Sequence, residues 1–486
     1  MKKGFTLIEL LAVIVILAVI ALIATPIVLS IVRDSKQAAL LRTAEMYMSG
    51  LNNSIATEMF KDKTFKINDG TYRITDKGKV CIGEYENKVC TGTELNVEID
   101  KNKPTDGIVE IENKTAKNYY FIIDNKTITN LNSTPHFCFE TKENEDGTLK
   151  ITNYLCSRGD FIITDVVIPN KINDKDVTII GRSSFMWPWS NNVKHLTSVV
   201  IPSGITTIES DAFRNNYLTE IVIPDSVKKI ESNAFESNRL TKINIPQTVS
   251  NIGNAIFNSN MLSNDEAFIY ARNEDGTEDR SRLVSYGGKN KDVTIPNNVV
   301  TIGAYAFQNC ELTNVKIPES VKTIEFGAFA TNNLTSISIP NTVTSISGLS
   351  FNNNKLSDDQ AFIYARNADG TEDRTYLVSY GGAKKDVVIP NGVTRICSYA
   401  LFFNQLTSVI LPETLTIIES AAFSNNKLTE IIIPESVKKI YRDAFSENKL
   451  ETVTIKGKDS LSDIEHYEKA FGWASGYSDQ NIKWEA

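Results

Sequence analysis

The chain has few of the residues from which catalytic and metal sites are usually built. Only three of its 486 residues are histidines. His136, His195 and His466 have neither metal-ligand spacing nor a nearby nucleophile. The motifs G-x-S-x-G, H-E-x-x-H and G-x-x-x-x-G-K-[ST] are absent. We therefore expect a protein that is not an enzyme and that needs no cofactor or metal.

The chain also lacks an excess of positive charge. It has 51 Lys and Arg residues against 59 Asp and Glu residues, which gives a net charge of −8. A protein whose main partner is nucleic acid needs a basic surface, so we do not expect nucleic acid as a partner. The length exceeds what one hydrophobic core supports, and two or three domains are expected.

Charge of either sign is almost missing near the N-terminus. Glu9 is the only charged residue between Lys3 and Arg33. The apolar run from Leu10 to Val32 is about 34 Å long as a helix, enough to span a bilayer, whereas the apolar core of a secretory signal peptide is shorter. A carboxylate in such a segment is costly, so Glu9 is a functional candidate unless it simply reaches back to the interface.

The segment MKKGFTLIE and the apolar run after it resemble the signal segment of type IV pilins and pseudopilins. The resemblance implies that prepilin peptidase cuts after Gly4 and that Phe5 becomes an N-methylated N-terminus. It also implies that Glu9 neutralises the Phe5 amine of a neighbouring pilin or pseudopilin subunit. Lys2 and Lys3 would keep the leader in the cytoplasm, which makes a single-pass protein of the bacterial cell membrane with most of the chain outside the cell.

The next part of the chain changes from a helical to a strand pattern. Helical periodicity continues past Pro26 without a glycine until Gly50, and short alternating strands follow from Phe65 to Ile163. We expect an α+β protein with a leader at 1–4, a transmembrane and stem helix at 5–60, and a small antiparallel pilin-like head at 61–160.

Four of the six cysteines flank expected hairpin loops in this head. Cys81 and Cys90 surround GEYENK, and Cys138 and Cys156 surround a stretch that contains Asp146-Gly147. If the loop 146–148 closes the second hairpin, residues whose numbers sum to 294 lie opposite each other, as 138 and 156 do. Two disulfides are expected in an exported domain, with half-buried reduced thiols as the alternative.

From Pro169 onward the sequence is periodic. The prolines from Pro202 are spaced 22, 22, 50, 22, 22, 50, 22 and 22 residues apart, so a block of 94 residues recurs. Apolar residues follow each of these prolines at fixed distances of three, six and eleven positions, which predicts a repeated core. Cys310 and Cys397 are expected to be packing residues. The prolines that end apolar strands are Pro169, Pro202, Pro224, Pro246, Pro296, Pro318, Pro340, Pro390, Pro412 and Pro434.

The repeats carry the spacing L-x-x-I-x-I, as in Leu218-x-x-Ile221-x-Ile223. They resemble the leucine-rich repeats of BspA-like bacterial surface proteins. The resemblance implies a solenoid with a parallel β-sheet face over 161–456, in which stacked units share one core. Residues 457–486 lack the pattern and are expected to cap the last repeat.

Two longer units, near 264–288 and 358–382, contain the string N-x-D-G-T-x-D. Asp275-Gly276 and Asp369-Gly370 predict hairpin turns, so each insertion is expected to project as a β-hairpin. An EF-hand-like calcium loop would need Glu at the twelfth position, where Val284 stands, so a solvated turn is favoured.

In each predicted strand, the residue between the last two core positions should point outward. Val388, Ile410 and Ile432 fall on consecutive strands and should form one apolar surface row. Such a row is typical of a contact surface, although β-branched residues also favour strands wherever they point. The full set is Val167, Val200, Val222, Asn244, Thr294, Lys316, Ser338, Val388, Ile410, Ile432 and Thr454.

These features favour a membrane-anchored, pilin-like surface protein whose solenoid adheres to an unknown protein or surface glycan. The alternative is a minor pseudopilin of a secretion, pilus or DNA-uptake machine. In that case ligand contact would be incidental.

Overall fold

The computed structural model divides the chain into two compact units, one of residues 1–135 with 158–162 and one of residues 136–157 with 163–486. Each unit is described by itself. The residues that the structure describes are 39, 42–62, 64–68, 70–75, 77–82, 85–86, 89–90, 92–97, 103–112, 114–123, 126–129, 134, 136–156, 163–186, 195–458, 464–465, 470–471 and 482–485.

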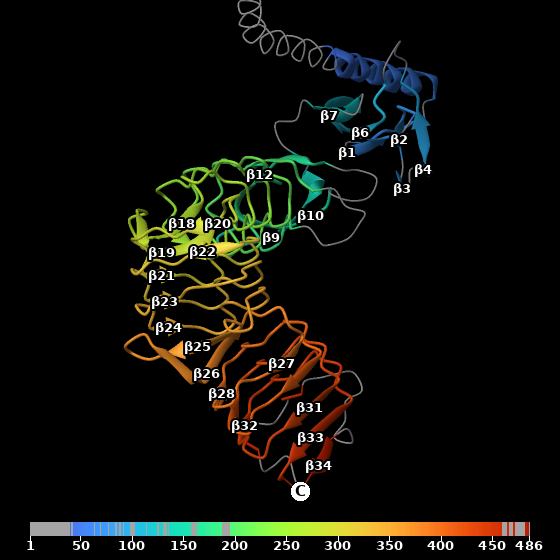
Figure 1. Cartoon of the computed structure of the whole chain (residues 1–486). Coiled ribbons are helices and arrows are strands. Elements are labelled where there is room, and N and C mark those ends of the chain that lie inside the picture. Colours follow the sequence, from blue (N-terminus) through green and yellow to red (C-terminus); the bar gives the residue numbers. More distant parts are fainter. Residues whose placement is uncertain are drawn as a thin grey trace, which may run out of the picture. The chain divides into compact units, whose positions relative to one another are not determined.

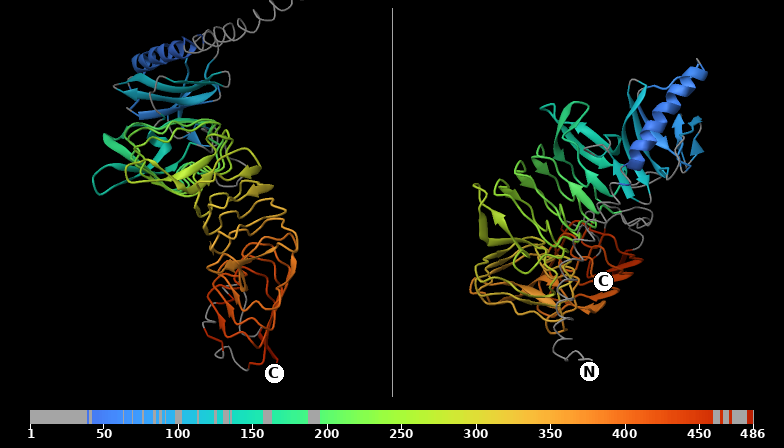
Figure 2. Two further views of the ribbon diagram at one scale, coloured as in Figure 1. Left: turned by 60° about the vertical axis from the view of Figure 1, so that its left-hand side comes forward. Right: turned by 90° about the horizontal axis from the view of Figure 1, so that it is seen from above.

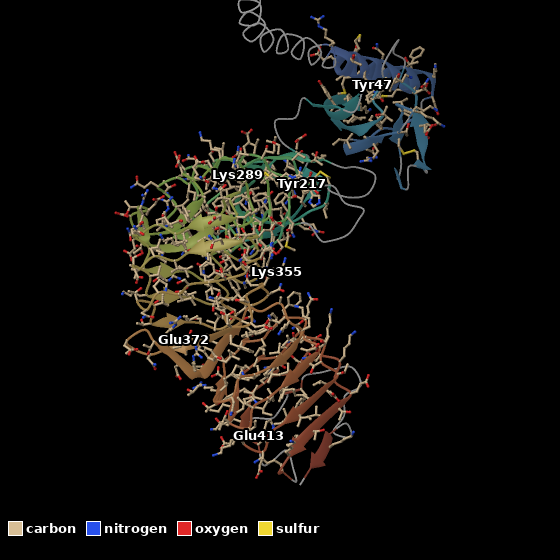
Figure 3. The ribbon with its side chains drawn as sticks, in the orientation of Figure 1. Tyr47, Tyr217, Lys289, Lys355, Glu372 and Glu413 are labelled. Atoms are coloured by element: carbon tan, nitrogen blue, oxygen red, sulfur yellow. A yellow bond between two sulfur atoms is a disulfide. The ribbon has the colours of Figure 1, made fainter. Side chains whose placement is uncertain are left out.

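In the first unit a helix over residues 42–61 covers an antiparallel sheet (Figures 1 and 2). Ala44, Tyr47, Leu51 and Ile55 recur at helical spacing and are buried against the sheet. The Tyr47 hydroxyl donates to Gly78 O at 3.0 Å (Figure 3). The strand order is β5 (Thr93–Leu95), β2 (Val80–Ile82), β1 (Gly70–Ile74), β6 (Asp106–Glu112), β7 (Thr115–Ile123), β8 (Lys126–Thr129).

Within the described residues no helix has the length and apolar character needed to cross a bilayer. The span expected from Leu10 to Val32 lies outside those residues, as does most of the expected stem before residue 42.

The second unit is a solenoid of stacked repeats, and its L-x-x-I-x-I segments form the expected parallel strands (Figure 1). Alternation holds in these strands, because the middle residue of each short strand faces the core and its neighbours face outward. The strands of this first column are β11 (Asp165–Val167), β14 (Ser198–Val200), β20 (Asp292–Thr294), β22 (Asn314–Lys316), β27 (Asp386–Val388), β29 (Ser408–Ile410), β31 (Glu430–Ile433) and β33 (Thr452–Lys456).

A second column of parallel strands, not expected from the sequence, follows the proline of each repeat. Each strand is only two residues long and ends on the isoleucine six residues after the proline. The strands are β15 (Thr207–Ile208), β16 (Lys229–Ile230), β17 (Asn251–Ile252), β21 (Thr301–Ile302), β23 (Thr323–Ile324), β24 (Ser345–Ile346), β28 (Arg395–Ile396), β30 (Ile417–Ile418) and β32 (Lys439–Ile440).

The prolines make the turn between the two columns. Each proline carbonyl accepts the N–H of the apolar residue three positions later, as in Val227 N to Pro224 O at 3.0 Å and Val437 N to Pro434 O at 3.1 Å. Proline cannot donate to a ladder, so it ends the first strand and fixes where the chain bends.

A stack of phenylalanine rings fills the core. Adjacent rings are nearly parallel, with centroids between 5.0 and 5.4 Å apart in the pairs Phe213–Phe235, Phe235–Phe257, Phe307–Phe329, Phe329–Phe351 and Phe423–Phe445. These rings are fully buried. Leu401 takes the phenylalanine position in one repeat and is also fully buried.

A ladder of buried asparagines satisfies the backbone beside this stack. Asn332 donates to the carbonyls of Phe307 and Phe329 at 2.8 and 2.9 Å and accepts the Leu312 N–H at 2.9 Å. One side chain therefore joins adjacent repeats and satisfies groups that would be costly to leave unpaired. The same position holds Asn216, Asn238, Asn260, Asn354, Asn426 and Asn448.

The two insertions form hairpins at the expected turns, but they do not project. They consist of β18 (Phe268–Arg272) with β19 (Glu278–Tyr286), and of β25 (Phe362–Arg366) with β26 (Glu372–Tyr380). β19 pairs in parallel with β21, and β26 pairs with β28. The second strand of each insertion is therefore itself a rung of the second column.

The solenoid unit begins before residue 161, the boundary expected from the sequence. β9 (Phe139–Glu143) and β10 (Leu149–Tyr154) form a hairpin, and β10 pairs in parallel with β13 (Lys175–Ile180). Residues 136–157 therefore belong to the solenoid rather than to the head. At the other end, β34 (Ile482–Glu485) pairs with β33.

Candidate binding surface

Val388, Ile410 and Ile432 form an exposed apolar row, here called the ridge. Their side chains are 62, 59 and 52 % exposed. Val388 and Ile410 lie directly opposite each other in the β27–β29 pair, and Ile432 holds the same position one repeat later. The alternation of the strands places all three on one face of the solenoid.

The layer under the ridge is rigid. Val387, Val409 and Ile431 alternate with the ridge residues and are at most 8 % exposed, and Leu406 and Leu428 are fully buried. Ile389 N donates to Ile410 O at 3.0 Å and ties two of the rungs together. The ridge therefore stands on closely packed β-structure.

Carboxylates border the ridge, which the sequence reasoning did not identify. Asp386 and Glu430 lie two residues before Val388 and Ile432 and are exposed on the same side of their strands. Glu413, marked in Figure 3, follows Pro412 and approaches Lys456, with 3.9 Å between Oε1 and Nζ. Acidic groups thus surround an apolar centre. The alternation of the strands could have predicted Asp386 and Glu430.

Two members of the expected outward row are not exposed. Thr454 is only 8 % exposed, because β34 pairs alongside β33 and lies opposite this residue. Val167 in β11 is half-buried. The other nine residues are exposed as expected, so alternation fails only near the ends of the stack.

Both expected disulfides are present, Cys81–Cys90 and Cys138–Cys156. The reasoning that paired the second was wrong in its register. Facing residues of β9 and β10 sum to 292 and then to 293 after a bulge, so Cys138 lies opposite Leu155. The cysteines still meet, with Cα atoms 5.1 Å apart.

The two other cysteines, Cys310 and Cys397, are free thiols in the packed repeats. Burial raises the pKa of Cys310 to about 12. Burial also raises the pKa of Cys397, although a hydrogen bond from Tyr376 opposes the shift. Both thiols are therefore protonated near neutral pH, which is unfavourable for nucleophilic chemistry.

The acidic residues of the hairpin turns are used within the turns. The Asp275 carboxylate accepts hydrogen bonds from Thr277 N and Oγ1 at 2.9 and 2.6 Å, and Asp369 does the same with Thr371. Over the described ranges no group of three or more His, Cys, Asp or Glu residues could hold a metal ion. Gly4, Phe5 and Glu9 lie outside those ranges.

Comparison with known proteins gives two family matches. Six copies of the BspA type leucine rich repeat region match residues 178–267, 285–362 and 379–471, and the prokaryotic N-terminal methylation motif matches residues 1–25. No curated protein matches the chain.

Several solved structures also match, although their TM-scores are too low to support any argument. A leucine rich cell surface protein from Faecalibacterium prausnitzii is 25 % identical, with 73 % of this chain and 95 % of that chain covered and a TM-score of 0.34. A leucine-rich repeat protein from Eubacterium ventriosum is 22 % identical, with 67 and 95 % covered and a TM-score of 0.37.

The pneumococcal vaccine antigen PcpA is 20 % identical, with 65 and 79 % covered and a TM-score of 0.28. The repeat matches cover more than half of the sequence and coincide with the two strand columns, the proline turns and the asparagine ladder. The chain therefore belongs to the proteins with BspA-type leucine-rich repeats, joined here to a prokaryotic N-terminal methylation motif.

Proposed function

We propose that this chain is a surface-displayed adhesin that is anchored in the bacterial membrane through its N-terminal segment and binds a partner protein through the ridge. The methylation motif supports export with cleavage after Gly4 by a prepilin peptidase. The observation that carries the binding function is the exposed ridge on a rigid sheet. Three neighbouring aliphatic side chains on one face are typical of the centre of an interface.

The charges around the ridge define the partner that fits it. Asp386, Glu413 and Glu430 surround the apolar centre, with Lys456 as the nearby cation. A partner with an apolar strip and a rim of Lys or Arg would bury the ridge and pair with these carboxylates. Charge complementarity of this kind mainly sets specificity and association rate.

The test is binding of the full-length chain to host and bacterial surfaces. Ile410→Asp and Ile432→Asp should abolish attachment, because each places a charge where the partner must exclude water. Folding should change by no more than about 0.5 kcal/mol, since both side chains already face solvent. Leu428→Asp is the control for misfolding, because Leu428 is fully buried. Attachment of both Ile variants at the wild-type level would refute the ridge as the binding surface.

A minor pseudopilin is the second candidate, and the methylation motif favours it. In that function the chain would join a filament or secretion machine, and the ridge would contact other subunits or nothing. Loss of secretion or DNA uptake upon gene deletion, with surface attachment intact, would favour this alternative.

A further inference from the structure

A cleft lies where the second insertion interrupts the first strand column. On one side is the segment Ile337–Ile339 of the preceding repeat, and on the other is the hairpin of β25 and β26, whose Glu372 is marked in Figure 3. The column has no regular strand at this repeat. Instead, Ile337 N donates to the side-chain Oε1 of Gln360 at 2.9 Å. The insertion thus separates two repeats that would otherwise pair.

The hairpin tip closes the cleft at one end. Gly370 has φ of +81°, and a Cβ on it would lie 1.5 Å from Asn341 O. Arg366 holds the same turn, with Nη1 donating to Gly370 O at 3.0 Å. The cleft is therefore shaped by backbone packing and does not depend on a long surface side chain.

Several polar groups of the cleft have no partner in the described part of the chain. The side chains of Ser338, Asn341 and Asp359 are exposed and form no hydrogen bond there, and Arg366 has a buried Nε without an acceptor. A carboxylate and an amide are planar groups that can bind two neighbouring hydroxyls at once. Free polar groups that converge on a concave surface mark a ligand site.

The charges of the cleft balance. Glu372 pairs with Arg374 at 3.0 Å, and Asp358 pairs with Lys384. Asp359 and Arg366 remain, one of each sign, so neither an acidic nor a basic ligand is favoured. Ile337, Ile339 and Phe362 are half-buried and give the cleft an apolar part that suits the C–H face of a sugar ring.

We propose that this cleft binds a neutral oligosaccharide, with Asp359 and Asn341 binding hydroxyl groups and Phe362 packing against the ring. An extended peptide fits less well, because the free strand edge is short and Gln360 already occupies the Ile337 N–H. The site is separate from the ridge and does not depend on the protein partner proposed for it.

The first insertion repeats much of this chemistry 94 residues earlier. Asp265 corresponds to Asp359, and Arg272 donates to Gly276 O at 2.9 Å and likewise has a buried Nε without an acceptor. A Cβ on Gly276 would lie 1.6 Å from Gln247 O. Two such sites on one solenoid would bind a repetitive glycan with avidity, which can exceed single-site affinity by about 10²- to 10⁴-fold.

The test uses the full-length chain in a non-glycosidic detergent. It is applied to immobilised neutral hexose and N-acetylhexosamine oligosaccharides, with sialylated oligosaccharides and extended peptides for comparison. We expect retention on neutral oligosaccharides. Asn341→Ala and Asp359→Ala should each weaken binding of a short oligosaccharide about tenfold, since each removes hydrogen bonds to the ligand. Combining Asp359→Ala with Asp265→Ala should remove avidity for a polymer.

Asp225→Ala is the matched control, because Asp225 is also an exposed carboxylate with no hydrogen bond within the described residues. Ile410→Asp should leave oligosaccharide binding unchanged, which separates this site from the ridge. Unchanged thermal melting of all variants would show that the losses are local. Retention on peptides or sialylated oligosaccharides alone, or neutral binding that survives Asp359→Ala with Asp265→Ala, would overturn the proposal.

Discussion

Cys310 and Asn404 occupy the same position of the asparagine ladder in successive 94-residue blocks, directly after an insertion. In an ordinary repeat the asparagine Oδ1 accepts the N–H of a leucine 20 residues earlier, as Asn426 does with Leu406. The insertion removes that donor, and Asn404 Oδ1 is buried without a partner. Cys310 avoids the problem, because its Sγ only needs to donate to nearby carbonyls at 3.4 Å.

This difference predicts opposite effects for two exchanges. Asn404→Cys should be neutral or stabilising, because it removes an unsatisfied acceptor. Asn426→Cys should cost about 1–3 kcal/mol, because it leaves Leu406 N and several carbonyls unpaired. Denaturant unfolding of the full chain measures both, and an equal loss for the two variants would contradict the account.

Glu236 predicts a pH dependence of stability. It is 2 % exposed, and burial raises its pKa to about 7, although Arg214 lies 3.1 Å away and opposes the shift. The folded state therefore binds a proton that the unfolded state has already lost between about pH 4.5 and 7. The contribution of this group to stability falls as the pH rises through that window, by up to about 3 kcal/mol.

Glu236→Gln should remove this loss. The variant should unfold at higher denaturant concentration than wild type at pH 8, with a smaller difference at pH 5. Other carboxylates, such as Glu231 with its pKa lowered by Lys229, act in the opposite direction and are common to both proteins. A difference between variant and wild type that does not change with pH would contradict the assignment.

At the scale of elements, the turns of the first hairpin of the solenoid and of the second insertion make a matched pair. Gly147 and Gly370 each follow an Asx-type aspartate and have φ near +80°. A Cβ on Gly147 would meet nothing within 4 Å, whereas one on Gly370 would meet Asn341 O at 1.5 Å. The backbone strain is the same at both sites, but only Gly370 packs against another repeat.

Gly147→Ala should therefore cost about 1 kcal/mol from the left-handed conformation alone. Gly370→Ala should cost more, because the tip must also move away from the Asn341 turn, and it should weaken oligosaccharide binding by opening the cleft. Thermal melting and oligosaccharide binding of the two variants provide the measurement. Equal losses would mean that the tip is not held against the preceding repeat.

The sequence predicted the elements that have a clear alternation and missed those that do not. The L-x-x-I-x-I strands and the ridge follow from alternate residues facing one core, and the structure contains them. A strand of two residues such as Thr207–Ile208 has no alternation to detect. The insertions were expected to project, because the partner that receives their second strand lies 20 residues further along the chain.

Long-range contacts explain the remaining differences. The bulge between Ile151 and Asn153 shifts the register beside Cys138, and no local pattern marks it. Thr454 is covered by β34, which comes from the aperiodic C-terminal segment. The insertion cleft requires both the hairpin and the preceding repeat, so neither segment predicts it alone.

At the scale of the whole molecule, the methylation motif joins a repeat solenoid to a segment typical of pilin subunits. The Gly4–Phe5 junction predicts a mature chain that begins with N-methylated Phe5. Mass spectrometry of the native N-terminus measures this directly. A native terminus at Met1, or one beyond Ala24, would refute pilin-type processing.

Glu9 then separates anchoring from assembly. If Glu9 neutralises the Phe5 amine of a neighbouring subunit, Glu9→Val should leave membrane insertion intact or improve it, because a charge is removed from an apolar segment. Incorporation into any filament should weaken, because the amine of the neighbour loses its partner. The measurement is fractionation of cells that express tagged mutant and wild-type chains together, with Glu9→Asp as the variant that retains the charge. Unchanged incorporation of Glu9→Val would mean that Glu9 only reaches back to the membrane interface, and that the solenoid is displayed by single anchored chains.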